Sequence, residues 1–392
     1  MTERVIAWAN VNTGTANLAG VNHLRAIVAD AFSALGAAVE EVPLQPAVDV
    51  GSEGEVIRRP FAPALRLTKR PHAENRIFLA IHIDTVYPAD HPFQTVEQLD
   101  GNTLRGPGVI DAKGGLVVML TALEALERSP FAEAIGWEVL INTDEEIGSV
   151  GSAPLLVEAA RRNDIGLVFE PTLPDGGMVD RRRGVGNFTV VVRGKAAHAG
   201  RDFAAGRNAV VAAARLVVQV DALNASLPGV TMNVGQLAGG SVPNVVPDVA
   251  VCRINVRTTV PEDEARVLKA LRGIVSEAGT ADGIRAELHG TFTSPPKPVD
   301  QAMRALMDHV AACGRDLGIP ITWRPSGGAC DGNKLTAAGL PTVDTLGPRG
   351  GDLHSPTEYL LLDSLTERAK LSALLLMKIA SGELKLPPKP GD

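Results

Sequence analysis

The chain has 392 residues, of which 45% are hydrophobic and 21% are charged, as in ordinary globular proteins with a sizeable core. Its net charge of -7 and the lack of a long basic run argue against a nucleic-acid partner. The first ten residues do not resemble a secretory signal, and the apolar stretches at 116–120 and 371–380 are too short to cross a bilayer. Three cysteines without a CxxC motif fit a reducing compartment, so we expect a cytoplasmic protein with no membrane partner.

The first part of the chain alternates strands with helices. Residues 76–83 (RIFLAIHI) form an almost continuous apolar run, which is typical of a strand buried on both faces. Apolar residues at helical spacing predict a helix at 115–126, and residues 137–142 and 166–170 are two more apolar runs of strand length. This alternation predicts an α/β domain with a mostly parallel sheet covered by helices.

The pattern changes near residue 184, where strands with alternating polarity begin. Six elements follow in the order β-α-β-β-α-β, at 187–193, 208–223, 231–237, 250–257, 261–277 and 284–289. This is the order of a ferredoxin-like unit, so we expect an inserted α+β domain at 184–294.

The α/β pattern resumes after the prolines at 295–298. Two helices are expected there, each with an aspartate cap at its start and a glycine at its end: Asp300 and Gly318, and Asp363 and Gly382. Residues 1–183 and 295–392 are therefore expected to form one domain, with the proline-rich residues 384–392 as a frayed tail.

Residues that can bind a metal follow the buried strands. His82 and Asp84 lie at the end of the first strand and share a face, because they are two residues apart. A carboxylate beside an imidazole can fix its tautomer and orientation, as metal-bound histidines require. Glu170 ends another strand. Taken singly, these residues also fit ordinary surface positions.

Three loops carry further candidates. Asp111 follows the glycine-rich segment 106–108 and precedes a helix, where it could equally be an N-cap. The run Asp144-Glu145-Glu146 directly follows a strand, where three carboxylates need a positive partner unless the loop is solvated. His354 lies in a loop rich in glycine and proline.

The positions of these residues are more informative than their types. His82, Glu145–Glu146 and Glu170 all lie at the carboxyl ends of expected strands, the edge at which sites form in open α/β sheets. Two histidines with several carboxylates match the nitrogen and oxygen ligands that zinc prefers. The sequence therefore predicts a metal site at this edge.

Eight segments carry a family resemblance: 80–86 (AIHIDTV), 106–115 (GPGVIDAKGG), 142–152 (NTDEEIGSVGS), 169–171 (FEP), 194–200 (GKAAHAG), 243–248 (PNVVPD), 326–332 (SGGACDG) and 353–359 (LHSPTEY). The chain resembles, in these motifs and in their order, the zinc metallopeptidase family of glutamate carboxypeptidase, succinyl-diaminopimelate desuccinylase and aminoacylase. The resemblance extends from about Val11 to Ala380. The resemblance implies an aminopeptidase/carboxypeptidase-like di-zinc catalytic domain with a mixed, mostly parallel sheet. It also implies that the inserted ferredoxin-like domain serves as a lid or for dimerisation.

The resemblance implies five ligands for two Zn²⁺ ions, or for Co²⁺ or Mn²⁺ in their place: His82, Asp111, Glu146, Glu170 and His354. Asp111 would bridge the two ions, each of which would have one histidine, and the peptide bond after Asp111 would be cis. Asp84 would orient His82, and Glu145 would be the general base. A glutamate at position 170, where some branches have aspartate, is similar to the glutamate carboxypeptidase branch.

The family's oxyanion donor is a histidine of the inserted domain, which corresponds here to His198 in GKAAHAG. The insert would have to close over the site, or a partner subunit would have to supply this residue. The resemblance therefore implies a homodimer that forms through the inserted domain.

Four residues are candidates for substrate contact: Asn244, Arg257, Gly327 and Gly328. Arg257 suits a substrate carboxylate but would equally form a structural ion pair, and the two glycines offer backbone amides but also suit a tight turn. Glutamate-releasing relatives carry an arginine-rich segment where the insert ends. Residues 289–294 contain no arginine, which argues against a glutamate side chain as the group recognised.

The leading hypothesis is a zinc-dependent hydrolase that cleaves a small amide or short peptide next to an amino-acid carboxylate, as a carboxypeptidase or an N-acyl amino acid amidohydrolase. A deacylase of an intermediate in amino-acid biosynthesis is the alternative within enzymes. A catalytically silent binding or scaffolding dimer is the alternative from another class. Loss of Glu145 or of a ligand would favour the silent dimer, but all of these residues are present.

Overall fold

The computed structural model describes residues 1–387 and divides the chain into two compact units. The first contains Met1–Pro46, Pro60–Arg182 and Lys297–Asp392, and the second contains Ala47–Arg59 and Arg183–Pro296. The expected boundaries of the insert, 184 and 294, therefore lie within two residues of those of the second unit. The last part of the expected tail, 388–392, lies outside the described residues.

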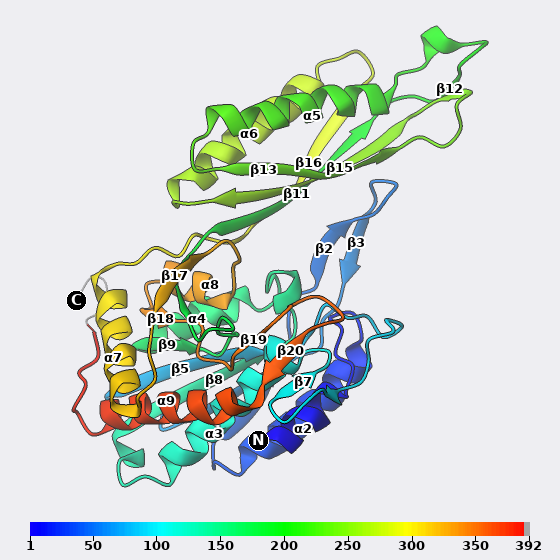
Figure 1. Ribbon diagram of the computed structural model, residues 1–392. Helices are drawn as coiled ribbons and strands as arrows, with labels where there is room; N and C mark the ends of the chain where they lie inside the picture. Colours follow the sequence, from blue (N-terminus) through cyan, green and yellow to red (C-terminus); the bar gives the residue numbers. More distant parts are fainter. Residues whose placement is uncertain (388–392) are drawn as a thin grey trace. The chain divides into compact units, whose positions relative to one another are not determined.

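A mixed six-stranded sheet forms the centre of the first unit (Figure 1). Its strands lie in the order β1 (Ala38–Val42), β4 (Ala64–Lys69), β8 (Ile135–Asn142), β5 (Asn75–His82), β9 (Ile165–Val168) and β18 (Thr342–Val343). The last four are parallel to one another, whereas β1 and β4 pair antiparallel. This confirms the prediction of a mostly parallel sheet.

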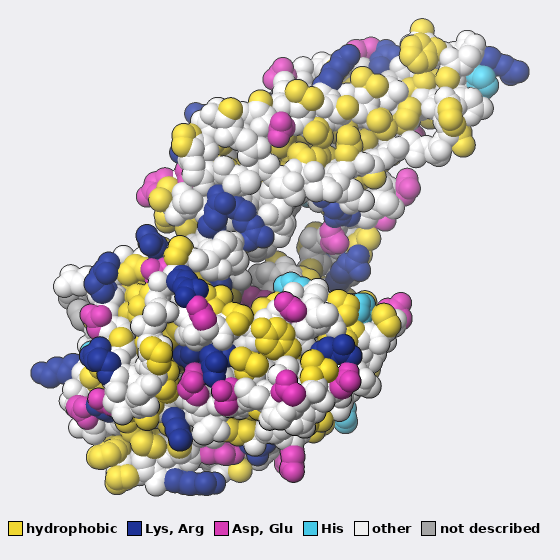
Figure 2. Space-filling view, in the orientation of Figure 1, with side chains coloured by type: hydrophobic (Ala, Val, Ile, Leu, Met, Phe, Trp, Pro, Cys, Tyr) yellow, Lys and Arg dark blue, Asp and Glu magenta, His cyan; other side chains and the backbone are white. Residues whose placement is uncertain are grey.

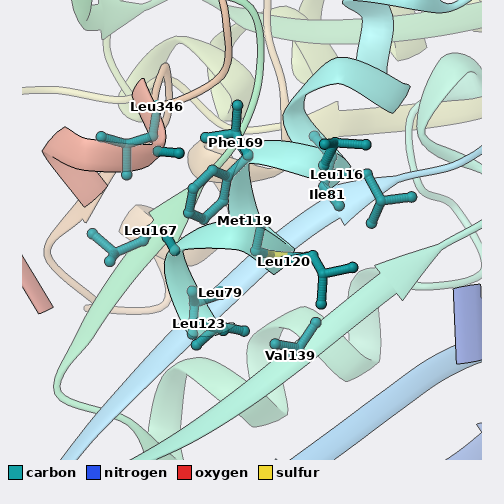
Figure 3. Close-up of a cluster of buried hydrophobic side chains, with 14 of the residues drawn as sticks. Leu79, Ile81, Leu116, Met119, Leu120, Leu123, Val139, Leu167, Phe169 and Leu346 are labelled. Atoms are coloured by element: carbon teal, nitrogen blue, oxygen red, sulfur yellow. The ribbon is translucent and has the colours of Figure 1, made fainter. Parts of the chain in front are cut away.

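Helices cover both faces of this sheet because its central strands are apolar on both sides. Leu79 and Ile81 of β5 pack with Leu116, Met119 and Leu123 of α3 on one face (Figure 3). Phe78 and Ala80 belong to a second cluster on the other face, with residues of α4 and α8. The helices of the unit are α1 (Thr2–Ala9), α2 (Leu18–Ser33), α3 (Gly115–Glu127), α4 (Ala153–Arg162), α7 (Gln301–Leu317), α8 (Asp331–Ala337) and α9 (Leu362–Ala380).

Two smaller sheets complete the first unit. One has the strand order β19 (Gly350–Gly351), β20 (Tyr359–Leu361), β7 (Thr103–Arg105) and β6 (Glu97–Gln98). The other pairs β10 (Met178–Arg182) with β17 (Trp323–Ser326).

The second unit has the predicted ferredoxin-like topology. Its antiparallel sheet has the order β13 (Thr231–Gly239), β15 (Val249–Thr258), β11 (Gly184–Arg193) and β16 (Arg285–Ser294). The helices α5 (Ala209–Ser226) and α6 (Glu262–Ala278) pack on it through one apolar cluster. A short ladder of β12 (Ala197–His198) and β14 (Val245–Val246) lies outside the main sheet.

Three expectations from the sequence are wrong. The hairpin of β2 (Ala47–Val50) and β3 (Val56–Arg59) belongs to the second unit rather than to the catalytic domain, because Arg253 donates a 2.6 Å hydrogen bond to the carbonyl of Val50. Asp363 lies inside the first turn of α9, whose N-cap is Leu361. The start of the expected tail is not frayed, because Leu384 packs against the core and bonds to Lys378.

One helix of the described residues, α5, is long and apolar enough to cross a membrane by length and composition. It contributes Ala213, Leu216 and Val220 to the apolar cluster under the sheet of the second unit. Hydrophobic side chains lie on the surface of the second unit (Figure 2). On α5 they include Val218, which is 70% exposed.

Candidate metal centre

Three neighbouring parallel strands bring the candidate residues to one edge of the sheet. His82 is the last residue of β5 and pairs in register with Asn142, the last residue of β8. Glu145 and Glu146 follow β8 in a short helical turn, and Glu170 follows β9 by two residues. The prediction that these side chains share one edge is confirmed.

Asp111 lies between the two histidines. Its Oδ1 is 3.1 Å from Nε2 of His82, and its Oδ2 is 3.2 Å from Nε2 of His354. Glu170 lies 3.8 Å from the same nitrogen of His82, and Glu146 lies 3.2 Å from that of His354. The cluster therefore has two halves that share the carboxylate of Asp111.

The geometry of this cluster is compatible with metal binding. One ligand atom each of His82, Asp111 and Glu146 lie within 4.8 Å of one another. His354 reaches the cluster from the loop between β19 and β20, where its backbone has a φ of 62° in the left-handed region. The peptide bond between Asp111 and Ala112 is cis, as the family resemblance implies.

Asp84 does more than the sequence indicated. The Nδ1 atom of His82 lies 3.1 Å from its carbonyl oxygen and 3.4 Å from its carboxylate, which fits the expected orienting contact. The same buried carboxylate also accepts the backbone N–H groups of Glu145 and Glu146, each at 3.2 Å. Asp84 thus connects the loop of one histidine to the turn that carries both glutamates.

The electrostatics of the cluster favour a bound cation. Burial and then the nearby Glu170 raise the pKa of Glu145 well above its ordinary value. Burial and Asp111 raise the pKa of Glu146 to about 7. Hydrogen bonds with Asp111 and Glu146 raise the pKa of His354 to about 10. Carboxylates crowded in this way repel one another unless positive charge compensates them, and the histidines alone supply that charge only when protonated.

A second polar network, which the sequence did not reveal, holds the turn that carries the glutamates. Asp144 accepts the N–H groups of Gly151 and Ser152 and also the hydroxyl of Ser152. Asp331 accepts hydrogen bonds from Ser149 at 2.5 Å and from Asn142 at 2.6 Å. These contacts fix the turn after β8 to the start of α8.

The second unit brings His198 and Asn244 together. His198 pairs with Val245 in the β12–β14 ladder, and the next residue donates a 2.9 Å hydrogen bond to the carbonyl of Asn244. Nδ1 of His198 accepts the N–H of Gly200 at 3.1 Å, which favours the tautomer with a proton on Nε2. His198 and Asn244 are both exposed.

The other substrate candidates, Arg257, Gly327 and Gly328, differ in their local contacts. Nε of Arg257 donates a 3.0 Å hydrogen bond to Asn255, two residues away on β15. The N–H of Gly328 donates to the hydroxyl of Ser326 at 3.1 Å, as in a tight turn. A Cβ atom added to Gly327 would meet no atom within 4 Å. Packing therefore does not explain the glycine at position 327.

Arg182 is one of three consecutive arginines, at 181–183, but its side chain is only 9% exposed. Its guanidinium binds Asp344 at 2.9 and 3.1 Å, and Lys297 binds the same carboxylate at 2.7 Å. Arg182 ends β10, and Lys297 follows the second unit in sequence. The group thus joins the two chain segments that lead into and out of the insert.

A profile of known families matches residues 78–378 of the chain, and its description is peptidase family M20/M25/M40. The protein belongs to this family. Membership confirms the resemblance noted from the sequence and makes the protein a hydrolase of the metallopeptidase class. The match begins within β5 and ends within α9, so it includes every residue of the cluster around Asp111.

Several M20 relatives match most of the chain. Carboxypeptidase G2 of Pseudomonas sp. (strain RS-16) is 30% identical over 312 residues, which cover 78% of this chain and 74% of that protein. Succinyl-diaminopimelate desuccinylase of Nitrosospira multiformis is 28% identical over 299 residues, which cover 73% and 76%. The solved structure of the M20 family metallo-carboxypeptidase Sso-CP2 from Sulfolobus solfataricus is similar with a TM-score of 0.73 at 16% identity, covering 97% of this chain and 99% of that chain. The predicted fold class is confirmed.

Proposed function

We propose that this M20 protein hydrolyses an amide or peptide bond next to an amino-acid carboxylate, with two divalent cations held around Asp111. The shared position of Asp111 carries the proposal, because each of its oxygens faces one histidine and each of these histidines faces one glutamate. One half of the centre would be His82, Asp111 and Glu170. The other half would be His354, Asp111 and Glu146.

The donor atoms of this cluster fit two zinc ions or similar divalent cations. Imidazole nitrogens and carboxylate oxygens are ligands that zinc accepts, and the Asp84 contact with Nδ1 leaves Nε2 of His82 for the metal. Two cations bound there would polarise the scissile carbonyl and lower the pKa of water toward about 7.

Glu145 is the general base of the proposed mechanism. Its backbone is fixed by Asp84, and its half-buried carboxylate has a raised pKa near the cluster. It would take a proton from the attacking water and deliver it to the leaving nitrogen. The base and its neighbour Glu146, a ligand, thus have different roles on the same short turn.

His198 is the proposed donor to the oxyanion. The hydrogen bond from Gly200 to its Nδ1 leaves a proton on Nε2, so a neutral histidine can donate there. Asn244, held beside it by the β12–β14 ladder, is proposed to contact the substrate. Arg257 and the amides of Gly327 and Gly328 remain proposed substrate contacts.

Replacing His198 by alanine is expected to lower kcat by about 10²–10³-fold while the metal content stays at that of the wild type, because one oxyanion donor has effects of this size. The control is His289→Ala, at the other histidine of the second unit, which lies on β16. Steady-state kinetics and metal analysis of both variants test the role. Unchanged kcat in His198→Ala would remove it from the reaction.

The segments around His198 and Asn244 indicate which substrates fit. They border a cavity of about 350 Å³, and no charged side chain of the described residues 1–387 lines it. Its lining includes Phe203 and Val242, which are 67% and 50% exposed. Together with the lack of arginine at 289–294, this favours an apolar side chain or acyl group over a glutamate side chain. A dipeptide, an N-acyl amino acid and a biosynthetic acyl intermediate all remain within this class.

Features of the second unit support a homodimer. The strand β13 lies at one edge of its sheet, and α5 exposes Val211 and Val218. Such an edge and such an apolar surface are suited to pairing with a second copy. The three buried, free cysteines support the proposed cytoplasmic location.

Chelation is expected to abolish hydrolysis, and Zn²⁺ is expected to restore it with about two ions per chain, as the two-metal proposal requires. Metal analysis and a screen of N-acyl amino acids and dipeptides after reconstitution with Zn²⁺, Co²⁺ or Mn²⁺ measure both effects. A protein that binds no metal and cleaves nothing would instead support the silent scaffolding dimer.

A further inference from the structure

Glu358 is a buried acid that lies in the loop of His354 and contacts the loop of Asp111 without being one of the candidate ligands. Glu358 follows His354 by four residues in the sequence, and it is only 1% exposed. Its Oε1 accepts the backbone N–H groups of Ile110 at 3.1 Å and of Asp111 at 3.2 Å. The carboxylate therefore holds the backbone at the residue that faces both histidines.

Tyr87 extends this contact to a third loop. It follows His82 by five residues, and its ring is buried against His91 and Phe93. Its hydroxyl lies 2.8 Å from Oε2 of Glu358 and 2.9 Å from the carbonyl oxygen of Ser355. The hydroxyl thus bridges the loop after β5 and the loop that carries His354.

The backbone around Glu358 is already fixed on one side. Tyr359 pairs with Arg105 in the β20–β7 ladder, and the N–H of Gly106 donates to the carbonyl of Glu358 at 3.1 Å. The side chain of Glu358 then turns toward the segment that contains Asp111. The carboxylate of Glu358 and the hydroxyl of Tyr87 therefore connect three loops. These loops carry or follow His82, Asp111 and His354.

We propose that Glu358 and Tyr87 form a positioning pair that sets the spacing of the two halves of the metal centre by joining the loops of His82, Asp111 and His354. This inference rests on the proposed function, because it assigns a role toward the proposed cations. Neither residue is a metal ligand or a catalytic group. Partners of metal ligands commonly contribute 10–100-fold to metal affinity or activity, so an effect of about this size is expected from the pair.

The sharpest test is Tyr87→Phe, which removes one hydroxyl and keeps the aromatic ring in place. Zn²⁺ affinity, measured by competition with a chromogenic chelator, is expected to fall about 10–100-fold. kcat at limiting Zn²⁺ should fall with it, whereas KM at saturating Zn²⁺ should stay within about twofold of the wild-type value. The chain offers a matched control, since its other tyrosine is Tyr359, whose hydroxyl makes no hydrogen bond with any residue that the structure describes.

Glu358→Gln tests the other member of the pair. Glutamine keeps the size of the side chain, and its oxygen can still accept the two backbone N–H groups, but its amide nitrogen cannot accept the hydroxyl of Tyr87. Its effect on Zn²⁺ affinity should therefore be similar to that of Tyr87→Phe. If the two residues act together, the double variant should lose less affinity than the product of the two single losses. The melting temperature of the metal-free protein separates this effect from a general loss of stability.

The outcomes distinguish the pair from the proposed function. Wild-type protein that binds no Zn²⁺ overturns the proposed function. If Tyr87→Phe and Tyr359→Phe both bind Zn²⁺ with the affinity of the wild type, the positioning role is overturned and the proposed function is not. A lowered melting temperature in Tyr87→Phe without weaker Zn²⁺ binding also overturns it, because the hydrogen bond would then only stabilise the fold.

Discussion

Glu145→Gln is expected to lower kcat by about 10²–10⁴-fold, the range that a positioned general base contributes. Glutamine has nearly the size of glutamate but cannot accept the proton of the attacking water. The turn itself should not move, because Asp84 holds the backbone N–H of residue 145 rather than its side chain. Metal content should therefore remain that of the wild type.

Steady-state kinetics and metal analysis on the same protein samples measure both quantities. Glu3→Gln, at an exposed position in α1, is the matched control and should leave kcat unchanged. Retained activity in Glu145→Gln would remove this residue as the base. Loss of metal together with activity would instead indicate that Glu145 is a ligand.

Asp344→Asn is expected to destabilise the protein by about 3–5 kcal/mol, because it leaves the buried cations Arg182 and Lys297 without their shared anion. Urea unfolding followed by circular dichroism measures the change. The control is Asp363→Asn, which removes an exposed carboxylate 2.9 Å from Arg349 and should cost less than about 1 kcal/mol. Equal effects of the two substitutions would contradict the role assigned to the buried group.

The stabilising effect of Asp344 should depend on pH in a defined direction. Burial alone would raise the pKa of Asp344, but Arg182 and Lys297 outweigh it and lower the pKa to about 2. Because the pKa is lower in the folded than in the unfolded protein, the contribution is present above about pH 4 and is lost as the pH falls toward 2. The difference in unfolding free energy between wild type and Asp344→Asn should therefore shrink across this interval.

The ends of the strands that carry the candidate ligands could be predicted, because they follow from the local pattern of apolar residues. The apolar run ending at His82 and the runs before Glu145 and Glu170 indicated three buried strands, and parallel strands place their carboxyl ends at one edge. The roles within the cluster came from the family resemblance. The carboxylate of Asp111 lies between two histidines that are far apart in sequence, which no local spacing reveals.

What the sequence missed depends on contacts between distant segments. Nothing in the local sequence indicated that Arg182, one of three consecutive arginines, would pair with Asp344, which also binds Lys297. The second role of Asp84, holding the turn of Glu145, appears only when β5 and β8 lie side by side. Residues 47–59 had no sequence pattern that assigned them to the second unit. Their contacts in the folded chain do so, among them the hydrogen bond from Arg253 to Val50.

The cluster around Asp111 takes residues from both sides of the insert. His82, Asp111, Glu146 and Glu170 precede the second unit in sequence, and His354 follows it. Cations bound there would close a very long loop of the chain, much as a covalent cross-link does. If a protease cuts the backbone within 183–296, metal binding should then keep the segment after residue 297 attached to the segment before the cut. The enzyme would survive such a nick as two fragments held by β18 and by the metal centre.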